Sequence, residues 1–341
     1  MKKGFRWAAL SLIFVLTGLL MFGKISNILR KKTGAASDMI HSFYNLEENS
    51  LDVLCMGSSH GYSSFQPNVL WSEQGMTSYV MCSPRQTAAS TYYLLQEALC
   101  TQKPKVLLLE TYYFFTAEKY TDEESLRMAF DGVKLGKAKH EMISDLLAKK
   151  DWKEKLSYYI PFLKYHGRWN ELENNDFHSK TYLKGSIFDF TVYEMEEPKL
   201  VDMPQTLSKN VRRYLKKIRQ LCEEQDIELI LYTAPYSYQK AEDAESFYLK
   251  QGMNSAVKEY CEKHDIPYFD FQSSIETGID YTQDFRDYAH MNTRGAEKIT
   301  KYLGQYLKQN GTYSDHRGDE AFSSWERDYE KYAAEAAKKR K

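Results

Sequence analysis

The sequence predicts a three-layer α/β/α fold, in which helices cover both faces of an open, doubly wound parallel sheet. From residue 51 onward, short apolar runs alternate with amphipathic stretches, which is the order expected when each strand is followed by a helix. The runs are almost continuously hydrophobic, as strands buried on both faces are. Strands are predicted at residues 51–56, 78–81, 105–109, 227–232 and 267–271.

The amphipathic stretches around these strands are predicted helices. In the last of them, Ala296, Ile299 and Leu303 fall on one face at helical spacing, and Thr293 stands at the start as a predicted cap. The predicted helices cover residues 87–99, 207–224, 241–264 and 293–308.

The composition is that of a globular protein. Of the 341 residues, 43% are hydrophobic, which is enough to bury a large core and excludes a disordered chain. The formal net charge of −1 gives no reason to expect a nucleic-acid partner. The five cysteines have no CxxC or CxxH spacing, so neither a structural zinc site nor a disulfide-dense scaffold is predicted, and no metal or cofactor is expected.

Residues 1–32 are predicted to anchor the chain in a membrane. The uncharged residues 7–23 would form a helix of about 26 Å, just short of a hydrocarbon core of roughly 30 Å. A cleaved signal peptide is the main alternative, but the residues after Gly23 supply no small-residue cleavage site. A buried amino-terminal helix is a third interpretation. Basic residues flank the segment on both sides, so their number leaves its direction open.

One stretch of the sequence does not follow the alternation of strands and helices. Residues 120–202 are polar and rich in Lys, Glu and Tyr, and they are predicted to form a mostly helical insertion that caps the strand ends. The main domain then covers residues 50–308, and the charged tail, 309–341, is predicted to be a solvated helix.

The first predicted strand runs into a turn with the sequence GSSHG at residues 57–61. In a parallel sheet, ligands bind where strands end and helices begin. A serine at that place is exposed beside backbone N–H groups that stabilise developing negative charge. On its own, however, a Gly-Ser-Ser turn is more often a plain loop.

A second motif, DYAH at residues 287–290, begins 228 residues after Ser59. An Asp three residues before a His on one loop can hold one ring nitrogen, which leaves the other nitrogen to take a proton from a serine hydroxyl. Alone, this motif is typical of a surface turn with a capping Asp. His60 is another candidate base, but the side chains of adjacent residues rarely face each other.

Together, the GSSH turn after the first strand and the sequence DYAHMN at 287–292 resemble the SGNH (GDSL-type) hydrolase superfamily. In that family the nucleophilic serine follows the first strand in a Gly-Asp-Ser block, and the catalytic Asp and His lie three residues apart near the end of the fold. The resemblance implies a flavodoxin-like order of strands, with Ser59 as nucleophile, His290 as base and Asp287 as the carboxylate that orients it. Ser58 remains a rival for the nucleophile.

The chain departs from this family at the residues that complete the oxyanion hole. Where the family has a Gly and a Gly-x-Asn-Asp block, this chain has CSPRQ at 82–86 and ETYY at 110–113. A carboxylate at Glu110 would repel an oxyanion unless it were protonated or turned away, so a structural role that ties down the serine or histidine loop is favoured for it. The Gln86 amide is a candidate replacement donor. Contacts with substrate are predicted for Gln86, Glu110, Tyr112, Tyr236 and Asn292.

The Gly-Ser-Ser turn, the anchor and the Tyr-rich insertion look most like the DltD-like branch of the superfamily. Members of that branch are anchored outside the bacterial cytoplasm and act in acylating cell-envelope polymers, often beside a membrane-bound O-acyltransferase. The resemblance therefore implies a single-pass membrane protein with an extracytoplasmic catalytic domain. Its implied partners are an envelope polymer, an acyl donor and such an acyltransferase. Esterase and transferase use the same triad, so the sequence does not separate them.

Two rival functions remain at this stage. The first is a binding or scaffold protein that presents the polymer to the acyltransferase, because the usual oxyanion residues are missing. The second is a cytosolic lipase-like enzyme. Five thiols are unusual outside the cytoplasm, and Cys55, Cys100 and Cys222 are expected to be reduced and packed as small hydrophobes.

Overall fold

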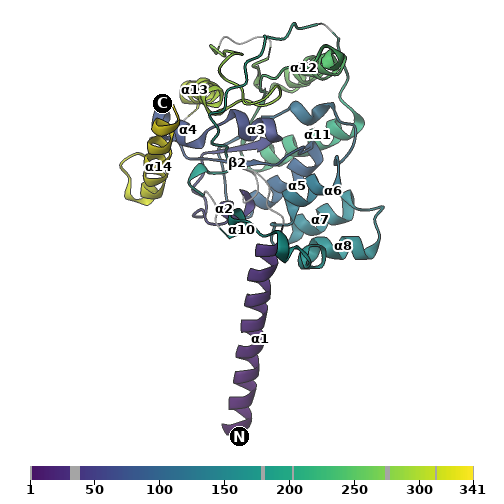
Figure 1. Ribbon diagram of the computed structural model, residues 1–341, viewed down its shortest axis with the longest axis vertical. Helices are drawn as coiled ribbons and strands as arrows, with labels where there is room; N and C mark the ends of the chain where they lie inside the picture. The colour runs from purple at the N-terminus through teal and green to yellow at the C-terminus, as the bar shows by residue number, and fades with distance from the viewer. Residues whose placement is uncertain are drawn as a thin grey trace.

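The computed structural model describes residues 2–30, 39–177, 181–201, 203–272, 277–311 and 313–340 (Figure 1). The predicted ends of the anchor at residue 32 and of the insertion at residue 202 lie outside these ranges. A body of sheet and helices sits at one end of a single long helix, α1 (Lys2–Leu29), and the amino terminus lies at the other end of that helix.

In the described part of the chain, the body is built on a five-stranded sheet in which all strands are parallel. The strands are β1 (Val53–Gly57), β2 (Ser78–Cys82), β3 (Val106–Glu110), β4 (Glu228–Thr233) and β5 (Tyr268–Asp270). Their order, β2-β1-β3-β4-β5, is the flavodoxin-like doubly wound order, in which the winding reverses between β1 and β3. The predicted fold class is confirmed, and so are all five strands, with ends displaced by one or two residues.

Each strand contributes side chains to two separate hydrophobic layers, because successive residues of a strand point to opposite faces of the sheet. In β1, Leu54 and Met56 lie in one layer, whereas Val53 and Cys55 lie in the other. Helices α5 (Ala88–Ala98), α11 (Lys209–Glu224) and α12 (Ala244–His264) pack into the first layer, and α3 (Ser59–Ser64), α4 (Pro67–Gln74) and α13 (Thr293–Asn310) into the second. Burial on both faces explains why β1 to β4 are almost continuously apolar, whereas β5 at the edge of the sheet is only half-buried.

The predicted helices that accompany the strands are all observed. α5 and α11 begin after Thr87 and Ser208, whose hydroxyls accept backbone N–H groups of the first turn. The prediction for the start of α13 is wrong in one detail. Its cap is Asn292, whose side chain accepts two N–H groups of the first turn, and Thr293 is the first helical residue.

The insertion differs from its prediction, because only its first part is helical and that part does not cap the strand ends. Met142, Ile143 and Leu146 of α7 (Lys137–Leu146) are buried in the same layer as α5, so the helical part covers the outside of that helix. Residues 185–201 contain no helix, and Tyr193 there donates its N–H to the carbonyl of Phe285. The insertion contains α6 (Glu123–Phe130), α7 (Lys137–Leu146), α8 (Trp152–Tyr159), α9 (Phe162–Tyr165) and α10 (Asn174–Phe177).

The charged tail contains a helix, as predicted, but this helix is not solvated on all sides. α14 (Ser323–Lys339) packs against α4, and Trp325, Tyr332 and Ala336 on it are buried. The ring of Trp325 stacks on Trp71 of α4 with the ring centroids 6.0 Å apart. The tail is therefore part of the folded body.

The five thiols are all reduced in the structure. Cys55 and Cys222 are buried, as predicted, and Cys82 and Cys261 are buried as well. The prediction fails at Cys100, which is exposed because it lies in the turn after α5 rather than on the buried face of the helix.

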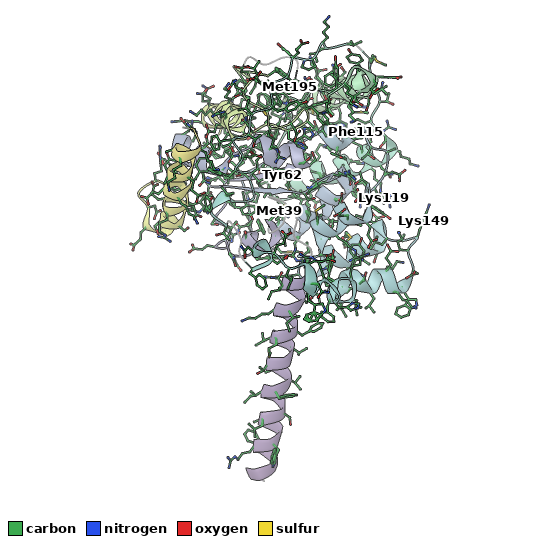
Figure 2. All side chains as sticks on the ribbon, in the orientation of Figure 1. Met39, Tyr62, Phe115, Lys119, Lys149 and Met195 are labelled. Atoms are coloured by element: carbon green, nitrogen blue, oxygen red, sulfur yellow. The ribbon has the colours of Figure 1, made fainter. Side chains whose placement is uncertain are left out.

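The amino-terminal helix stands clear of the body over most of its length (Figure 2). Its segment Gly4–Leu29 is long and apolar enough to cross a membrane, with a mean hydropathy of 2.1, and no residue of its most apolar 18-residue stretch is buried. This length and composition fit an uncleaved anchor or a signal sequence, as the sequence also indicates.

Candidate active site

The GSSHG sequence forms a sharp turn from β1 into α3. At Gly57 the backbone φ is +146°, a conformation that favours glycine, and a Cβ there would lie 2.7 Å from the Cβ of Glu110. Ser58 caps α3 through a hydrogen bond from the His60 N–H to its hydroxyl. Ser59 is the first residue of the helix, so the turn places its hydroxyl at the carboxyl edge of the sheet.

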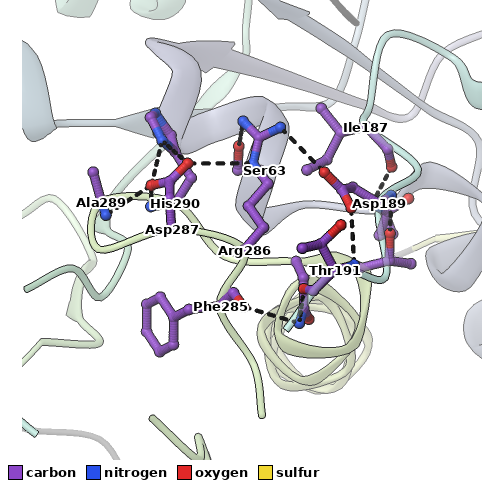
Figure 3. Close-up of polar contacts among 12 residues, drawn as sticks. Ser63, Ile187, Asp189, Thr191, Phe285, Arg286, Asp287, Ala289 and His290 are labelled. Carbon is purple, nitrogen blue, oxygen red and sulfur yellow. Dashed lines mark hydrogen bonds and ion pairs between the residues drawn. The ribbon is translucent and has the colours of Figure 1, made fainter. Parts of the chain in front are cut away.

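Ser59, His290 and Asp287 form a continuous chain of hydrogen bonds. The Oγ of Ser59 lies 2.8 Å from Nε2 of His290, and Nδ1 of His290 lies 3.0 and 3.1 Å from the two carboxylate oxygens of Asp287. Asp287 also accepts the backbone N–H groups of Ala289 and His290, which fix the carboxylate on its own loop (Figure 3). These contacts bring together the three residues predicted as a triad, and they place Ser59 rather than Ser58 against the base.

The carboxylate of Asp287 is held in its charged form. Burial alone would raise its pKa, but the hydrogen bond and charge of His290 and the N–H of Ala289 bring the pKa below its usual value. A charged Asp287 selects the imidazole tautomer with its proton on Nδ1, and this leaves Nε2 free to accept the proton of Ser59.

Arg286 contacts the triad carboxylate, and it was not among the predicted site residues. Its guanidinium reaches toward Asp287 at 3.9 Å, Asp189 at 3.7 Å and the hydroxyl of Ser63 at 3.5 Å (Figure 3). It thereby links the histidine loop to α3 and to the residues after the insertion helices. The sequence feature that could have indicated Arg286 as a site residue is its position directly before Asp287.

Tyr62 is a second residue at the site that was not predicted. It lies inside the body, one helical turn after Ser59 (Figure 2). Burial raises the pKa of Tyr62, while the charge of Arg286 and a hydrogen bond with Ser59 oppose that rise. The spacing of three residues on a helix places Tyr62 on the same side of α3 as Ser59, and this spacing is visible in the sequence.

Glu110 lies beneath the serine turn, at the end of β3. One oxygen accepts the hydroxyl of Ser58 at 2.9 Å, and the other accepts the N–H of Tyr112 at 2.7 Å. Burial raises the pKa of Glu110 to about 7, although these hydrogen bonds oppose the rise. The contacts fit the structural role favoured for this residue, because they tie the serine turn to the segment after β3.

Replacing Glu110 by Gln should remove a pH dependence from the stability of the protein. The pKa of Glu110 is raised in the folded state, so the folded state keeps its proton longer, and stability falls as pH rises from about 4.5 to about 7. The shift corresponds to roughly 3 kcal/mol in the free energy of unfolding. Denaturant unfolding at pH 5 and pH 8 should therefore show a smaller loss of stability for Glu110→Gln than for the wild type. Equal losses in the two proteins would contradict this role.

His60, Tyr112 and Tyr236 form an aromatic wall beside the triad. The ring of His60 stacks on Tyr112 with centroids 3.6 Å apart, and it lies 4.9 Å from the ring of His290. Tyr236 meets the Tyr112 ring edge-on at 4.8 Å. Tyr112 is partly exposed and Tyr236 is buried, so Tyr112 is the better placed of the two for the predicted contact with substrate.

His60 is not the base of this site. Its pKa lies well below the usual value, because the ring is buried and faces the charge of His290. Its Nδ1 has no hydrogen-bond partner among the described residues, and the nitrogen that meets Ser59 belongs to His290. His60 is therefore a neutral ring that packs beside His290, the histidine that contacts Ser59.

Gln86 and Asn292 are engaged inside the protein. The amide of Gln86 accepts the N–H and hydroxyl of Ser83 and donates to the hydroxyl of Thr91, and its side chain is buried. Asn292 caps α13 and donates to backbone carbonyls of residues 191, 283 and 285. Their hydrogen-bonding groups face protein atoms, so their predicted contact with substrate finds no support in this geometry. Among the described residues, no group of three His, Cys, Asp or Glu side chains is placed to hold a metal ion.

No model of a protein family matches this chain, and no curated protein sequence does. Among solved structures, it is similar to a predicted acylhydrolase from Bacteroides fragilis, with 12% identity and a TM-score of 0.40 over 82% of this chain and 99% of the other. It is also similar to a GDSL-like lipase from Bacteroides thetaiotaomicron, with 11% identity and a TM-score of 0.40 over 80% of this chain and 97% of the other. Similarity this distant assigns no activity.

Proposed function

We propose that this chain is a serine esterase or O-acyltransferase whose nucleophile is Ser59. The observation that carries the proposal is the hydrogen-bonded chain from Ser59 through His290 to Asp287. A hydroxyl 2.8 Å from an imidazole nitrogen, with the opposite nitrogen on a carboxylate, is the arrangement that activates a serine for attack on an acyl group.

The proposed reaction has two half-reactions. Ser59 Oγ attacks the carbonyl carbon of an ester, while Nε2 of His290 takes the hydroxyl proton. The tetrahedral intermediate collapses, the bond to the alcohol breaks, and His290 returns the proton to the departing oxygen. Water or an acceptor hydroxyl then attacks the acyl-serine with the same proton transfers, which frees Ser59. The Ser59 N–H, at the first position of α3, is a first-turn donor without an intrahelical acceptor and is available to the oxyanion.

We further propose that the protein is anchored in a membrane by α1, with its body outside the cytoplasm. Its acceptor would then be a hydroxyl of a cell-envelope polymer, and its acyl donor would be supplied beside it by a membrane-bound O-acyltransferase. This part rests on the apolar length of α1 and on the likeness of the serine turn to the DltD-like branch. The helix that carries Ser59, α3, lies above the end of the body from which α1 leaves (Figure 1). That position suits a polymer outside the bilayer better than a lipid within it.

A scaffold protein without catalysis is the second candidate. The observation that favours it is the engagement of Gln86 and Asn292, whose side-chain amides donate to protein atoms rather than to an oxyanion. Such a protein would bind the polymer and keep the fold without stabilising a transition state.

Rapid mixing of the full-length chain in detergent with p-nitrophenyl acetate separates these functions. An acyl-enzyme mechanism predicts a burst of one nitrophenolate per chain before the slower steady state. Prior treatment with a fluorophosphonate should remove the burst. Wall glycan added to the reaction should become acylated if the acceptor is a sugar hydroxyl. Binding of glycan without any burst would instead favour the scaffold.

A further inference from the structure

An exposed apolar surface lies on residues 152–177, at the end of the body from which α1 leaves (Figure 1). Outside α1, the described residues include twelve exposed large apolar side chains, and six of them fall in this segment of the chain. Trp152 and Trp169 are 68% and 65% exposed. The surface consists of Trp152, Leu156, Ile160, Leu163, Trp169 and Phe177. Such a concentration calls for a partner, because exposed tryptophans on a soluble surface are rare.

The 152–177 surface is fixed directly to the amino-terminal helix. The ring of Phe162 in α9 meets Phe22 of α1 with centroids 5.0 Å apart. Arg168 donates to the carbonyls of Leu29 and Arg30 at 2.8 and 2.9 Å, at the carboxyl end of α1. The depth of α1 in a membrane therefore also sets the depth of this surface.

The length of the uncharged segment places the surface at the edge of the bilayer. Residues 7–23 extend about 26 Å as a helix, so they fill most of a hydrocarbon core of roughly 30 Å. Phe22 lies at the end of this segment nearest the body and is the residue that Phe162 contacts. The boundary between hydrocarbon and head groups thus falls at α9. Tryptophan is the residue that membrane proteins enrich at that boundary.

The charges of residues 152–177 indicate which interaction would bind the surface to the bilayer. Residues 152–177 contain four basic and four acidic side chains, so the surface offers little net attraction to anionic lipid. Burial of the aromatic and aliphatic side chains must supply the binding free energy. Zwitterionic lipid should therefore be sufficient as a partner.

We propose that the 152–177 surface lies in the interfacial layer of the same bilayer that α1 spans. The inference rests on the anchor proposed above. With two attachments in place of one, the body cannot swing freely about α1. α3, which carries Ser59, is then held on the side away from the lipid, where a wall polymer is reached.

Lipid-borne quenching in nanodiscs tests this placement in the full-length chain. Leu156 and Trp169 are replaced by Cys one at a time in a Cys100→Ser background, so that a bimane reacts only at the chosen site. Leu249→Cys on α12 is the matched control, because Leu249 is 40% exposed and Leu156 is 37% exposed. Leu16→Cys reports on α1, and because residue 16 lies near the middle of residues 7–23 it is read with a second phosphatidylcholine that carries its nitroxide near the end of the acyl chain. Phosphatidylcholine with a nitroxide near the head group should quench positions 156 and 169 at least threefold more than position 249.

The outcomes separate this inference from the anchor. Quenching at position 16 with none at 156 or 169 beyond the level of 249 would overturn the interfacial surface and leave the anchor intact. Cross-linking between chains through position 169, with no quenching there, would assign the surface to a second copy and also overturn the inference. No quenching at position 16 would overturn the anchor, and the interfacial surface with it.

Discussion

Replacing Ser59 by alanine is expected to lower the rate of ester hydrolysis about 10³-fold or more and to abolish labelling by a fluorophosphonate. The physical reason is the position of its hydroxyl, which is 2.8 Å from Nε2 of His290. Without it no acyl-enzyme forms, and only binding and the remaining electrostatic stabilisation contribute to the rate. The full-length chain in detergent is suitable for both measurements, with gel fluorescence reporting the label.

Ser58→Ala is the matched control, because Ser58 is the adjacent serine of the same turn. Its hydroxyl donates to Glu110 and caps α3, so its loss should cost about 1 kcal/mol of stability. Labelling should persist, since Ser58 does not touch His290. Labelling that is retained in Ser59→Ala and lost in Ser58→Ala would move the nucleophile to Ser58 and contradict the geometry.

The sequence was sufficient to predict those features that depend on local pattern. β1 to β4 were found because burial on both faces makes their sequences almost continuously apolar. β5, at the edge of the sheet, is only half-buried and ends in Asp270, but it was found as well. The Asp287–His290 contact was also predictable. Two residues three positions apart on one loop are close enough to form a hydrogen bond whatever the rest of the fold does.

The contacts that could not be predicted join residues far apart in the chain. Glu110 meets Ser58 only because β1 and β3 are neighbours in the sheet, and Arg286 meets Asp189 only because the residues after the insertion helices return to the histidine loop. The location of the insertion helices was missed for the same reason, since an amphipathic helix shows that it packs but not on which surface. Residue type likewise identified Gln86 and Asn292 as possible hydrogen-bond donors to substrate. Which atoms their amides face depends on the packed structure, and there they donate to protein atoms.

Replacing Asp287 by asparagine is expected to lower kcat/KM for a small ester by about 10²- to 10⁴-fold, with little change in fluorescence-detected unfolding. The asparagine keeps the shape of the side chain, but it no longer provides a charge to hold the Nδ1 proton of His290 or to stabilise the imidazolium. Asp189→Asn is the control that isolates this effect. This substitution removes the carboxylate charge that lies 3.7 Å from Arg286, and it leaves the hydrogen bonds between Asp287 and His290 in place. If the two variants lost equal activity, Asp287 would act through Arg286 rather than through the imidazole. A much larger loss in Asp287→Asn is expected, because Asp287 alone is bonded to the ring that takes the Ser59 proton.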